Sequence, residues 1–221
     1  MNMMRTFLLA LLGFLIFKPV SGFAQGFTKN EKSIILSGDT ATMLRVTQIT
    51  EAEELKILTT VSTDINPKDP LIKVLARRMY LAMRDVTRPG IGIAGPQVGI
   101  NRNIIWVKRY DKEGEPFELY LNPKISWKSE LLRKGREGCL SIPDAVGDVV
   151  RHHAIKLNYF DQQGKAKEEI IEGFTAVIFQ HETDHLNGIL FTERLKEQET
   201  KIYNSLSGRL DFMQEKLYLR P

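Results

Sequence analysis

The chain has 221 residues, of which 43% are hydrophobic and 26% are charged. This length and composition are typical of one ordinary globular domain, which buries about 70% of its unfolded surface and needs neither disulfides nor a structural metal for stability. The 31 basic residues exceed the 27 acidic ones by a net charge of +4, and because both signs are interleaved we expect a mixed surface and no nucleic-acid-binding face.

The N-terminus has the pattern of an export signal. A basic start over residues 1–5 precedes a nearly uninterrupted apolar run over residues 6–17, and small residues follow within 21–24. The run is shorter than the roughly 20 apolar residues that span a bilayer. We therefore predict a cleaved signal peptide over residues 1–24 and an exported, periplasmic protein. An uncleaved membrane tether, an organellar presequence and a cytoplasmic chain that starts near Met43 are the alternatives.

The next part of the chain leads into the domain. Residues 25–42 are polar, and we interpret them as a flexible lead-in to a domain that begins at residue 43. We predict a short strand over residues 44–46. Residues 51–69 are predicted to form an irregular segment that ends in turn-forming residues. Asp69 can then cap a helix up to about residue 86, with Pro70 in its first turn. The apolar residues of this helix recur at helical spacing and indicate core packing: Leu71, Ile72, Leu75, Met79, Tyr80 and Met83.

Three glycines, Gly90, Gly92 and Gly95, follow in the spacing of a dinucleotide-binding loop. Such a loop must follow a strand and open a helix, whereas this one follows a helix and has Pro96 after its last glycine. We therefore expect no nucleotide site. The glycines instead allow close approach of another backbone, such as a bound peptide, and Gln97 can offer a side-chain amide donor.

Strand patterns dominate the middle of the chain, over residues 103–108, 117–121, 124–132, 149–160 and 166–171. Helical patterns flank them, so we predict an α+β fold with antiparallel β-sheets around a central helix, and with a further helix at the C-terminus. His152 and His153 fall within one strand, where alternation points them to opposite faces, and we expect neither to bind a metal.

The central helix is predicted over residues 173–188. Thr175 is its expected N-cap, and the Asn-Gly pair at 187–188 is its expected C-terminal stop. The run 176–179 is apolar nearly all round, which predicts a buried helix.

Two histidines on this helix have metal-binding spacing. His181 and His185 are about one turn apart on the same face, which lets both imidazoles bind one divalent metal. Glu182 lies beside the first histidine, where it can take a proton from metal-bound water. A chance arrangement on a polar surface is the alternative, and the apolar run before the histidines argues against it.

A catalytic metal site needs a third protein ligand. The metzincin class of zinc peptidases would place it at Phe191, so that class is excluded. A downstream glutamate is a second option, but none of those available stands out: Glu193, Glu197, Glu199 and Glu215. Cys139 is the better candidate, because it lies in a short run over residues 137–143 with glycine before it and proline after it. As the only cysteine it forms no disulfide within the chain, and it could instead be a small buried apolar residue.

The tail over residues 196–221 has the stripe of a C-terminal amphipathic helix, with apolar residues at Ile202, Leu206, Leu210, Met213 and Leu217. Its charges are mixed, with five basic and four acidic residues. We expect it to pack on the domain or on a partner chain.

Three segments together resemble the signature motifs of peptide deformylases, in that family's order: residues 90–99 (GIGIAGPQVG), 137–143 (EGCLSIP) and 180–185 (QHETDH). The resemblance extends over about residues 44–195. We therefore expect the catalytic domain to comprise residues 43–195. Gly95 departs from the family's usual pattern, and we expect this to loosen the loop without removing a reacting group.

The resemblance implies a metal-dependent hydrolase that removes the N-terminal formyl group from formylmethionyl peptides or proteins and releases formate. It implies three metal ligands, Cys139, His181 and His185, with the fourth position left for water. Glu182 would be the general acid and base on metal-bound water. The side-chain amide of Gln97 and the backbone N–H of Leu140 would stabilise the developing oxyanion.

The methionine side chain of the substrate would occupy an apolar pocket beside the metal. Val177 and Ile178 face the side of the helix that carries His181, and Ile91 could complete the pocket. The residues assigned to substrate binding are Ile91, Gly92, Gly138, Val177 and Ile178.

The family usually works with Fe²⁺, while zinc and nickel forms are known in it, so the resemblance implies one divalent metal ion. Export into an oxidising compartment would favour Zn²⁺, because Fe²⁺ and the thiolate oxidise there. The expected partners are N-formylmethionyl peptides. The mixed-charge tail argues against docking on the ribosome, and we expect a monomer or a weak homodimer.

Two other functions remain open. A zinc peptidase or amidase would use the same helix, would cleave unformylated peptides internally and would tolerate Cys139→Ala. A paralogue that binds formyl peptides without turnover would bind ligand and release no formate. The complete set of reacting residues argues against the second of these.

Overall fold

The computed structural model describes residues 26–206 and 212–215. Its helices are α1 (Lys29–Ile35), α2 (Ala52–Leu58), α3 (Leu71–Met83), the 3₁₀ helix η1 (Gly95–Val98), α4 (Gly173–Leu186) and α5 (Phe191–Glu199). Its strands are β1 (Gly92–Ala94), β2 (Ile104–Lys108), β3 (Phe117–Lys128), β4 (Leu132–Cys139), β5 (Ile142–His152), β6 (Ala154–Phe160), β7 (Ala166–Glu172), β8 (Tyr203–Ser205) and β9 (Phe212–Glu215).

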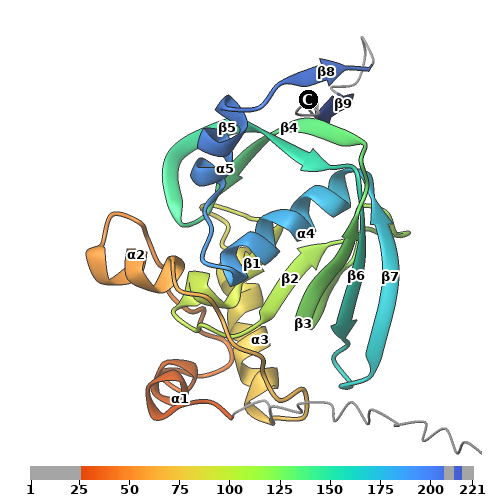
Figure 1. The fold of residues 1–221 in the computed structure, drawn as a ribbon. Helices are drawn as coiled ribbons and strands as arrows, with labels where there is room; N and C mark the ends of the chain where they lie inside the picture. Colours follow the sequence, from red (N-terminus) through yellow and green to blue (C-terminus); the bar gives the residue numbers. More distant parts are fainter. Residues whose placement is uncertain (1–25, 207–211, 216–221) are drawn as a thin grey trace, which may run out of the picture.

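The strands form two antiparallel sheets, one in the order β1-β2-β3-β6-β7 and the other in the order β5-β4-β9-β8. Figure 1 shows α4 running between them. The fold is therefore α+β, with antiparallel sheets around a central helix, as the sequence predicted.

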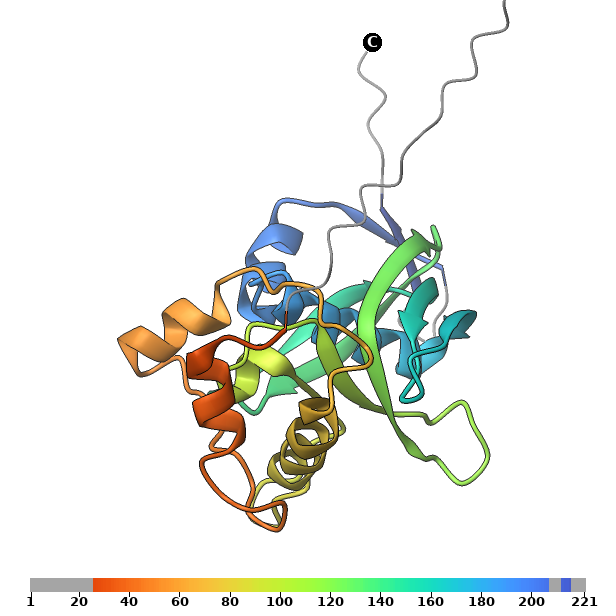
Figure 2. The same cartoon turned by 90° about the horizontal axis from the view of Figure 1, so that it is seen from below.

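The central strands of the larger sheet bury side chains on both faces, because successive residues of a strand point to opposite sides. Ile105 and Tyr120 pair across β2 and β3 and pack in one core with Phe179 of α4. The next pair, Ile104 and Leu121, faces the opposite side and joins the core under α3. Figure 2 shows α3 on the other side of the sheet from α4. The sheet thus holds α4 in a fixed position, which matters for the site it carries.

Strand β3 joins the predicted strand 117–121 to most of the predicted strand 124–132 and ends at Lys128. The expected break at residues 122–123 is an irregularity within one strand, with register shifts between Leu121 and Lys124. Asn122 takes a positive φ of 50°, and its side-chain amide accepts from Ile65 N at 2.8 Å and donates to Ile65 O at 2.9 Å. These two hydrogen bonds stabilise the irregular backbone at Asn122, and the residues on both sides of it belong to one strand.

The predicted strand over residues 149–160 is wrong as a single element. It is divided between β5 and β6, which belong to different sheets, and the chain crosses between the sheets at His153. Strand β4 was not predicted. It pairs along most of its length with β5, for example Arg136 with Asp148, so its formation depends on a partner strand.

The flexible lead-in predicted for residues 25–42 is also wrong over its described part. Thr28 and Glu31 form a capping box at the start of α1, and Ile35 is fully buried. Arg78 of α3 donates to the carbonyl of Ile35 at 2.8 Å, and Arg102 pairs with Glu31 at 2.7 Å. These contacts attach α1 to the domain.

Three other local predictions need correction. Residues 44–46 form no strand, and α2 occupies part of the segment expected to be irregular over residues 51–69. Helix α3 ends at Met83 rather than near residue 86. Pro70 is the N-cap of α3, and the predicted contribution of Asp69 comes from one position earlier, where its carboxylate accepts from Leu71 N at 2.9 Å.

The tail does not form the predicted helix in its described part. Helix α5 ends at Glu199, β8 and β9 follow, and β9 pairs with β4, with Met213 opposite Leu132. Ile202 and Leu206 are 50% and 55% exposed, so the apolar stripe does not build a core. Leu210, Leu217 and the predicted signal peptide over residues 1–24 lie outside the described residues. Of the helices described, none is long and apolar enough to cross a membrane.

Candidate metal centre and active site

Helix α4 presents the predicted chemistry from a buried position. It starts after Glu172, so the predicted N-cap Thr175 lies inside the helix, where it is 1% exposed. The C-terminal stop is as predicted. Asn187 is the C-cap and Gly188 has a φ of +70°, in contact with the Thr59 backbone.

Cys139 reaches the two histidines because β4 ends beside α4. Its Sγ lies 3.2 Å from His185 Nε2, and the candidate ligand atoms of Cys139, His181 and His185 all lie within 4.8 Å of one another. In the described part of the chain this is the one such group of Cys, His, Asp and Glu side chains. A thiolate and two imidazoles are a donor set that suits zinc or iron, with one position left open.

The alternative glutamate ligands have other partners or stay exposed. Glu193 accepts from Leu190 N at 3.2 Å, Glu197 pairs with Arg194 at 2.7 Å, and Glu215 pairs with Lys201 at 3.0 Å. Glu199 is exposed at the end of α5. Cys139 is therefore the third candidate ligand that the fold brings to the histidines.

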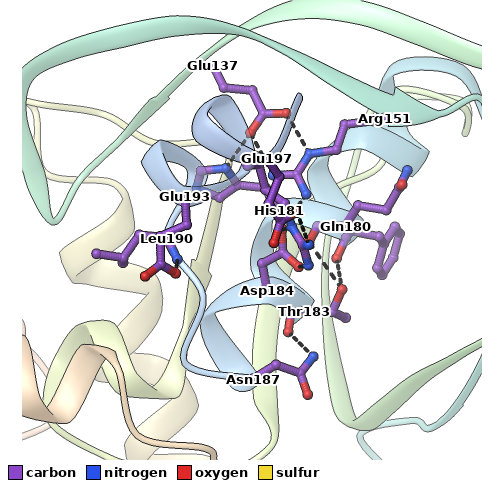
Figure 3. A network of polar contacts seen from close by, with 12 residues as sticks. Glu137, Arg151, Gln180, His181, Thr183, Asp184, Asn187, Leu190, Glu193 and Glu197 are labelled. Atoms are coloured by element: carbon purple, nitrogen blue, oxygen red, sulfur yellow. Dashed lines mark hydrogen bonds and ion pairs between the residues drawn. The ribbon is translucent and has the colours of Figure 1, made fainter. Parts of the chain in front are cut away.

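Glu137 contacts His181 and is itself held by Arg151, as Figure 3 shows. His181 Nδ1 lies 2.8 Å from Glu137 Oε2, and Arg151 donates to both oxygens of that carboxylate at 2.9 Å. Burial alone would raise the pKa of Glu137, but the hydrogen bonds from Arg151 and His181 outweigh it and lower the pKa to about 2. A carboxylate on Nδ1 fixes the ring and leaves Nε2 free to bind a metal.

A second carboxylate extends this network. Arg151 also donates to Asp184, which Arg194 holds from α5 through Nη2 at 2.6 Å and Nε at 3.0 Å. Although burial would raise the pKa of Asp184, the two guanidinium groups lower it. The network joins β4, β5, α4 and α5 around the candidate ligands. The sequence interpretation assigned no role to Glu137, Arg151, Asp184 or Arg194.

The thiol of Cys139 is prepared for ionisation. Burial by itself would raise its pKa, but the charges and hydrogen bonds of His185 and His181 outweigh this and hold the pKa well below the usual value. A thiolate is the form that binds a metal.

Gln97 is held so that its amide group faces the site. Its Oε1 accepts from Ala94 N at 2.8 Å, and Nε2 therefore points to Cys139 Sγ at 3.5 Å and Ser141 Oγ at 3.4 Å. The backbone carbonyl of Gln97 accepts from Thr47 N at 2.9 Å, which anchors η1. The structure thus places an oriented amide donor next to the Cys139 sulfur.

Glu182 is buried, and its Oε2 has no hydrogen-bond partner among the described residues. Burial raises its pKa to about 7, against the opposing effect of the neighbouring His181 and His185. Gly92 lies directly against it. A Cβ on Gly92 would be 2.3 Å from Glu182 Oε1.

The three loop glycines pack closely against other parts of the chain, which corrects part of the sequence interpretation. Gly92 makes room for a carboxylate, and a Cβ on Gly90 would meet the Leu140 side chain at 2.9 Å. A Cβ on Gly95 would be 2.6 Å from the carbonyl oxygens of Ile100 and Arg102. The prediction that Gly95 loosens the loop is therefore wrong, because a glycine there permits tight packing.

A cavity of about 520 Å³ opens beside this site. Its lining includes Gln97, Cys139, His181 and Glu182, and all the residues assigned to substrate binding or to the oxyanion, namely Ile91, Gly92, Gly138, Leu140, Val177 and Ile178. Arg88, Arg136, Asp144 and Phe174 also line it, and the sequence interpretation did not single them out.

His152 and His153 lie away from the candidate ligands. His152 Nδ1 is 2.6 Å from the Ser129 carbonyl, and the ring of His153 packs edge-on against Phe212 at 5.1 Å. The structural contacts of both rings agree with the prediction, but its reason applies only to His152, because His153 lies between β5 and β6 and outside any strand.

Comparisons with known proteins agree with this geometry. The family model described as polypeptide deformylase matches residues 43–201. A peptide deformylase of Caulobacter sp. (strain K31) is 40% identical over 152 residues, which cover 68% of this chain and 87% of that protein. The class I type b peptide deformylase of Acinetobacter baumannii with Met-Ala-Ser bound has a TM-score of 0.61 and 37% identity, over 69% of this chain and 98% of that one. The actinonin-bound form of the same enzyme has a TM-score of 0.61 and 35% identity, with coverage of 69% and 98%. The chain therefore belongs to the peptide deformylase family of enzymes.

Proposed function

We propose that this enzyme removes the formyl group from N-formylmethionyl peptides by a metal-dependent hydrolysis that releases formate. The observation that carries the proposal is the convergence of Cys139, His181 and His185 beside Glu182 and Gln97 around one cavity. Further support comes from the Acinetobacter baumannii relative, whose structure has Met-Ala-Ser bound.

Cys139, His181 and His185 would hold the metal through Sγ and the ring nitrogens. The metal, when bound, supplies a Lewis acid that polarises the formyl carbonyl and makes a water molecule more acidic. Glu137 holds Nδ1 of His181 at 2.8 Å, which keeps the ring in one orientation.

Glu182 would transfer the proton. Its carboxylate takes a proton from the attacking water while the water oxygen bonds to the formyl carbon. When the carbon–nitrogen bond breaks, the same carboxyl group gives this proton to the leaving amine. A pKa raised to about 7 suits a group that must accept and then donate near neutral pH.

The oxyanion that develops on the formyl oxygen would be bound by the Gln97 amide and the backbone N–H of Leu140. Gln97 suits this role because the Ala94 N–H fixes its carbonyl oxygen at 2.8 Å and turns its amide group toward the site. Loss of one such donor typically lowers kcat by about 10²-fold.

The methionine side chain would enter the apolar part of the cavity. Ile91, Val177 and Ile178 supply apolar surface, and Gly92 and Gly138 line the same cavity, where the peptide backbone would lie. One divalent metal would serve, Fe²⁺ by family resemblance, with Zn²⁺ or Ni²⁺ as alternatives. If the leader over residues 1–24 directs export, Zn²⁺ is the expected ion, and metal analysis of protein from its own compartment tests this.

The test is formate release from formyl-Met-Ala-Ser by the chain lacking residues 1–24, loaded under anaerobic conditions with Fe²⁺, Ni²⁺ or Zn²⁺. We expect release that disappears in Glu182→Ala while the bound metal is retained. Glu168→Ala, at an exposed position on β7, is the matched control. A folded, metal-loaded protein that binds the peptide and releases no formate would contradict the proposal and indicate a binding role.

A further inference from the structure

The mouth of the cavity carries two arginines that the proposed chemistry does not use. Arg88 comes from the segment between α3 and β1, and Arg136 from β4, and both line the cavity. Both residues are exposed, so they lie where the cavity meets solvent. The two arginines thus come from segments far apart in the chain and lie on the exposed lining of one cavity.

Their charges are not neutralised by neighbouring acids. Within residues 26–206 and 212–215, neither Arg88 nor Arg136 forms a salt bridge, and the polar contact of Arg88 is with the Ile142 carbonyl at 3.5 Å. By contrast, the buried Arg151 is paired with two carboxylates. The positive charge at the mouth is therefore available to a ligand.

The acidic groups of the cavity do not cancel this charge. Glu137 is buried and already bonded to Arg151 and His181, and Glu182 is buried beside the candidate ligands. Asp144 is the remaining acidic residue of the lining, exposed on β5. The mouth thus has two guanidinium groups for one exposed carboxylate.

We propose that this mouth binds a carboxylate of the formyl peptide, downstream of the methionine, so that acidic or short free-acid formyl peptides are the preferred substrates. The inference rests on the proposed deformylase function, which places the formylmethionine inside the cavity. A guanidinium group is the protein cation best matched to a carboxylate. The carboxylate can be the C-terminus of a short peptide or the side chain of Asp or Glu.

The expected effect is moderate because the groups are exposed. One exposed ion pair changes an affinity by about 1.4- to 5-fold, so two arginines together give about 2- to 25-fold, and we expect a preference in the middle of this range, about 3- to 10-fold.

The test compares kcat/KM of the full-length enzyme for two pairs of substrates that differ only in one carboxylate. The first pair is formyl-Met-Ala-Ser and its C-terminal amide. The second is formyl-Met-Ala-Asp-amide and formyl-Met-Ala-Asn-amide. We expect the acid to exceed its neutral partner by about 3- to 10-fold at low salt, and the ratio to approach one at about 0.5 M NaCl, where exposed charges are screened. A preference in the first pair identifies the peptide end as the source, and one in the second identifies a side chain.

Variants of the two arginines test whether the preference for a carboxylate arises at the mouth of the cavity. Arg88→Gln and Arg136→Gln should each lower the acid-over-neutral ratio, and the double variant should bring it close to one. Arg77→Gln removes an exposed arginine on α3, outside this cavity, and should leave the ratio unchanged. Ratios within twofold of one in both substrate pairs, or equal ratios in the wild type and the double variant, would overturn the inference.

Binding of the product separates this inference from the proposed function. The dissociation constants of Met-Ala-Ser and Met-Ala-Ser-amide, measured by calorimetry, do not depend on turnover. A lower dissociation constant for Met-Ala-Ser than for its amide, without formate release, would support carboxylate binding at the mouth and contradict the deformylase proposal. Formate release without any preference for the acid would contradict carboxylate binding at the mouth and leave the deformylase proposal intact. Carboxylate binding at the mouth would also be overturned if neither peptide binds.

Discussion

The contact between Gly92 and Glu182 gives a sharp test of the site. In Gly92→Ala the new Cβ would lie 2.3 Å from Glu182 Oε1, 2.8 Å from Cδ and 3.0 Å from Cγ. These distances are too short for non-bonded atoms, and the Glu182 carboxylate is the flexible partner. Gly92 does not have a left-handed φ, so the substitution adds no backbone strain. We expect the carboxylate to move.

The size of the effect follows from the geometry. An ordinary carbon–oxygen contact requires a shift of about 1 Å from the present position. A misplacement of about 1 Å of a reacting group can cost about 10²-fold in rate, or about 2.7 kcal/mol of activation free energy. The loss should fall on kcat, because Glu182 acts on the proton and does not hold the methionine.

The assay is formate release as a function of formyl-peptide concentration, with metal content and thermal unfolding measured on the same samples. Gly135→Ala is the control, since a Cβ there meets no atom within 4 Å. The reasoning is refuted if Gly92→Ala keeps kcat within threefold of the wild type. It is also refuted if only KM rises, because the methyl group would then obstruct the peptide rather than displace Glu182.

Three further predictions concern the groups around the site. Gln97→Met should lower kcat by about 10²-fold with little change in bound metal, and an unchanged kcat would remove Gln97 from the oxyanion site. Glu137→Gln should weaken metal binding about 10- to 100-fold in chelator competition, because the carboxylate orients His181. The pKa of Glu137 is lowered from 4.5 to about 2, so its stabilisation of the metal-free chain is complete above about pH 4.5 and is lost as the pH falls toward 2. The free energy of unfolding in urea should therefore fall less between pH 6 and pH 3 in this variant than in the wild type, and parallel curves would contradict the assignment. Arg194→Met removes both hydrogen bonds to Asp184 and should cost about 1–3 kcal/mol of unfolding free energy, against no measurable cost for the exposed Arg77→Met.

Local patterns predicted some elements well and failed on others for identifiable reasons. Helix α3 was predicted because its apolar residues recur at helical spacing, and α4 because an apolar run is followed by an Asn-Gly stop. Strand β4 was missed because residues 132–139 are rich in Arg, Lys and Gly and show no alternation, and they form a strand because β5 and β9 pair with them. Helix α1 could have been predicted, since Thr28 and Glu31 have the spacing of a capping box. The apolar stripe over residues 196–221 predicted a helix, whereas the described part of this segment beyond Glu199 contains the strands β8 and β9.

The sequence by itself determined the reacting groups. The four-residue spacing of His181 and His185, with Glu182 between them, fixes their relation within one helix. A local geometry of this kind needs no tertiary information. The three motifs in order were enough to indicate the family.

Only the tertiary structure decided how these groups meet. Cys139 lies 46 positions before His185, and it reaches that ring at 3.2 Å because β4 and α4 pack at the meeting of two sheets. The contact of Gly92 with Glu182 and the arginines at the mouth likewise join segments far apart in the chain. The clamp of Arg151 on Glu137 joins two paired strands, 14 positions apart. Such contacts depend on which elements pack together, and side-chain spacing along the chain carries no information about that.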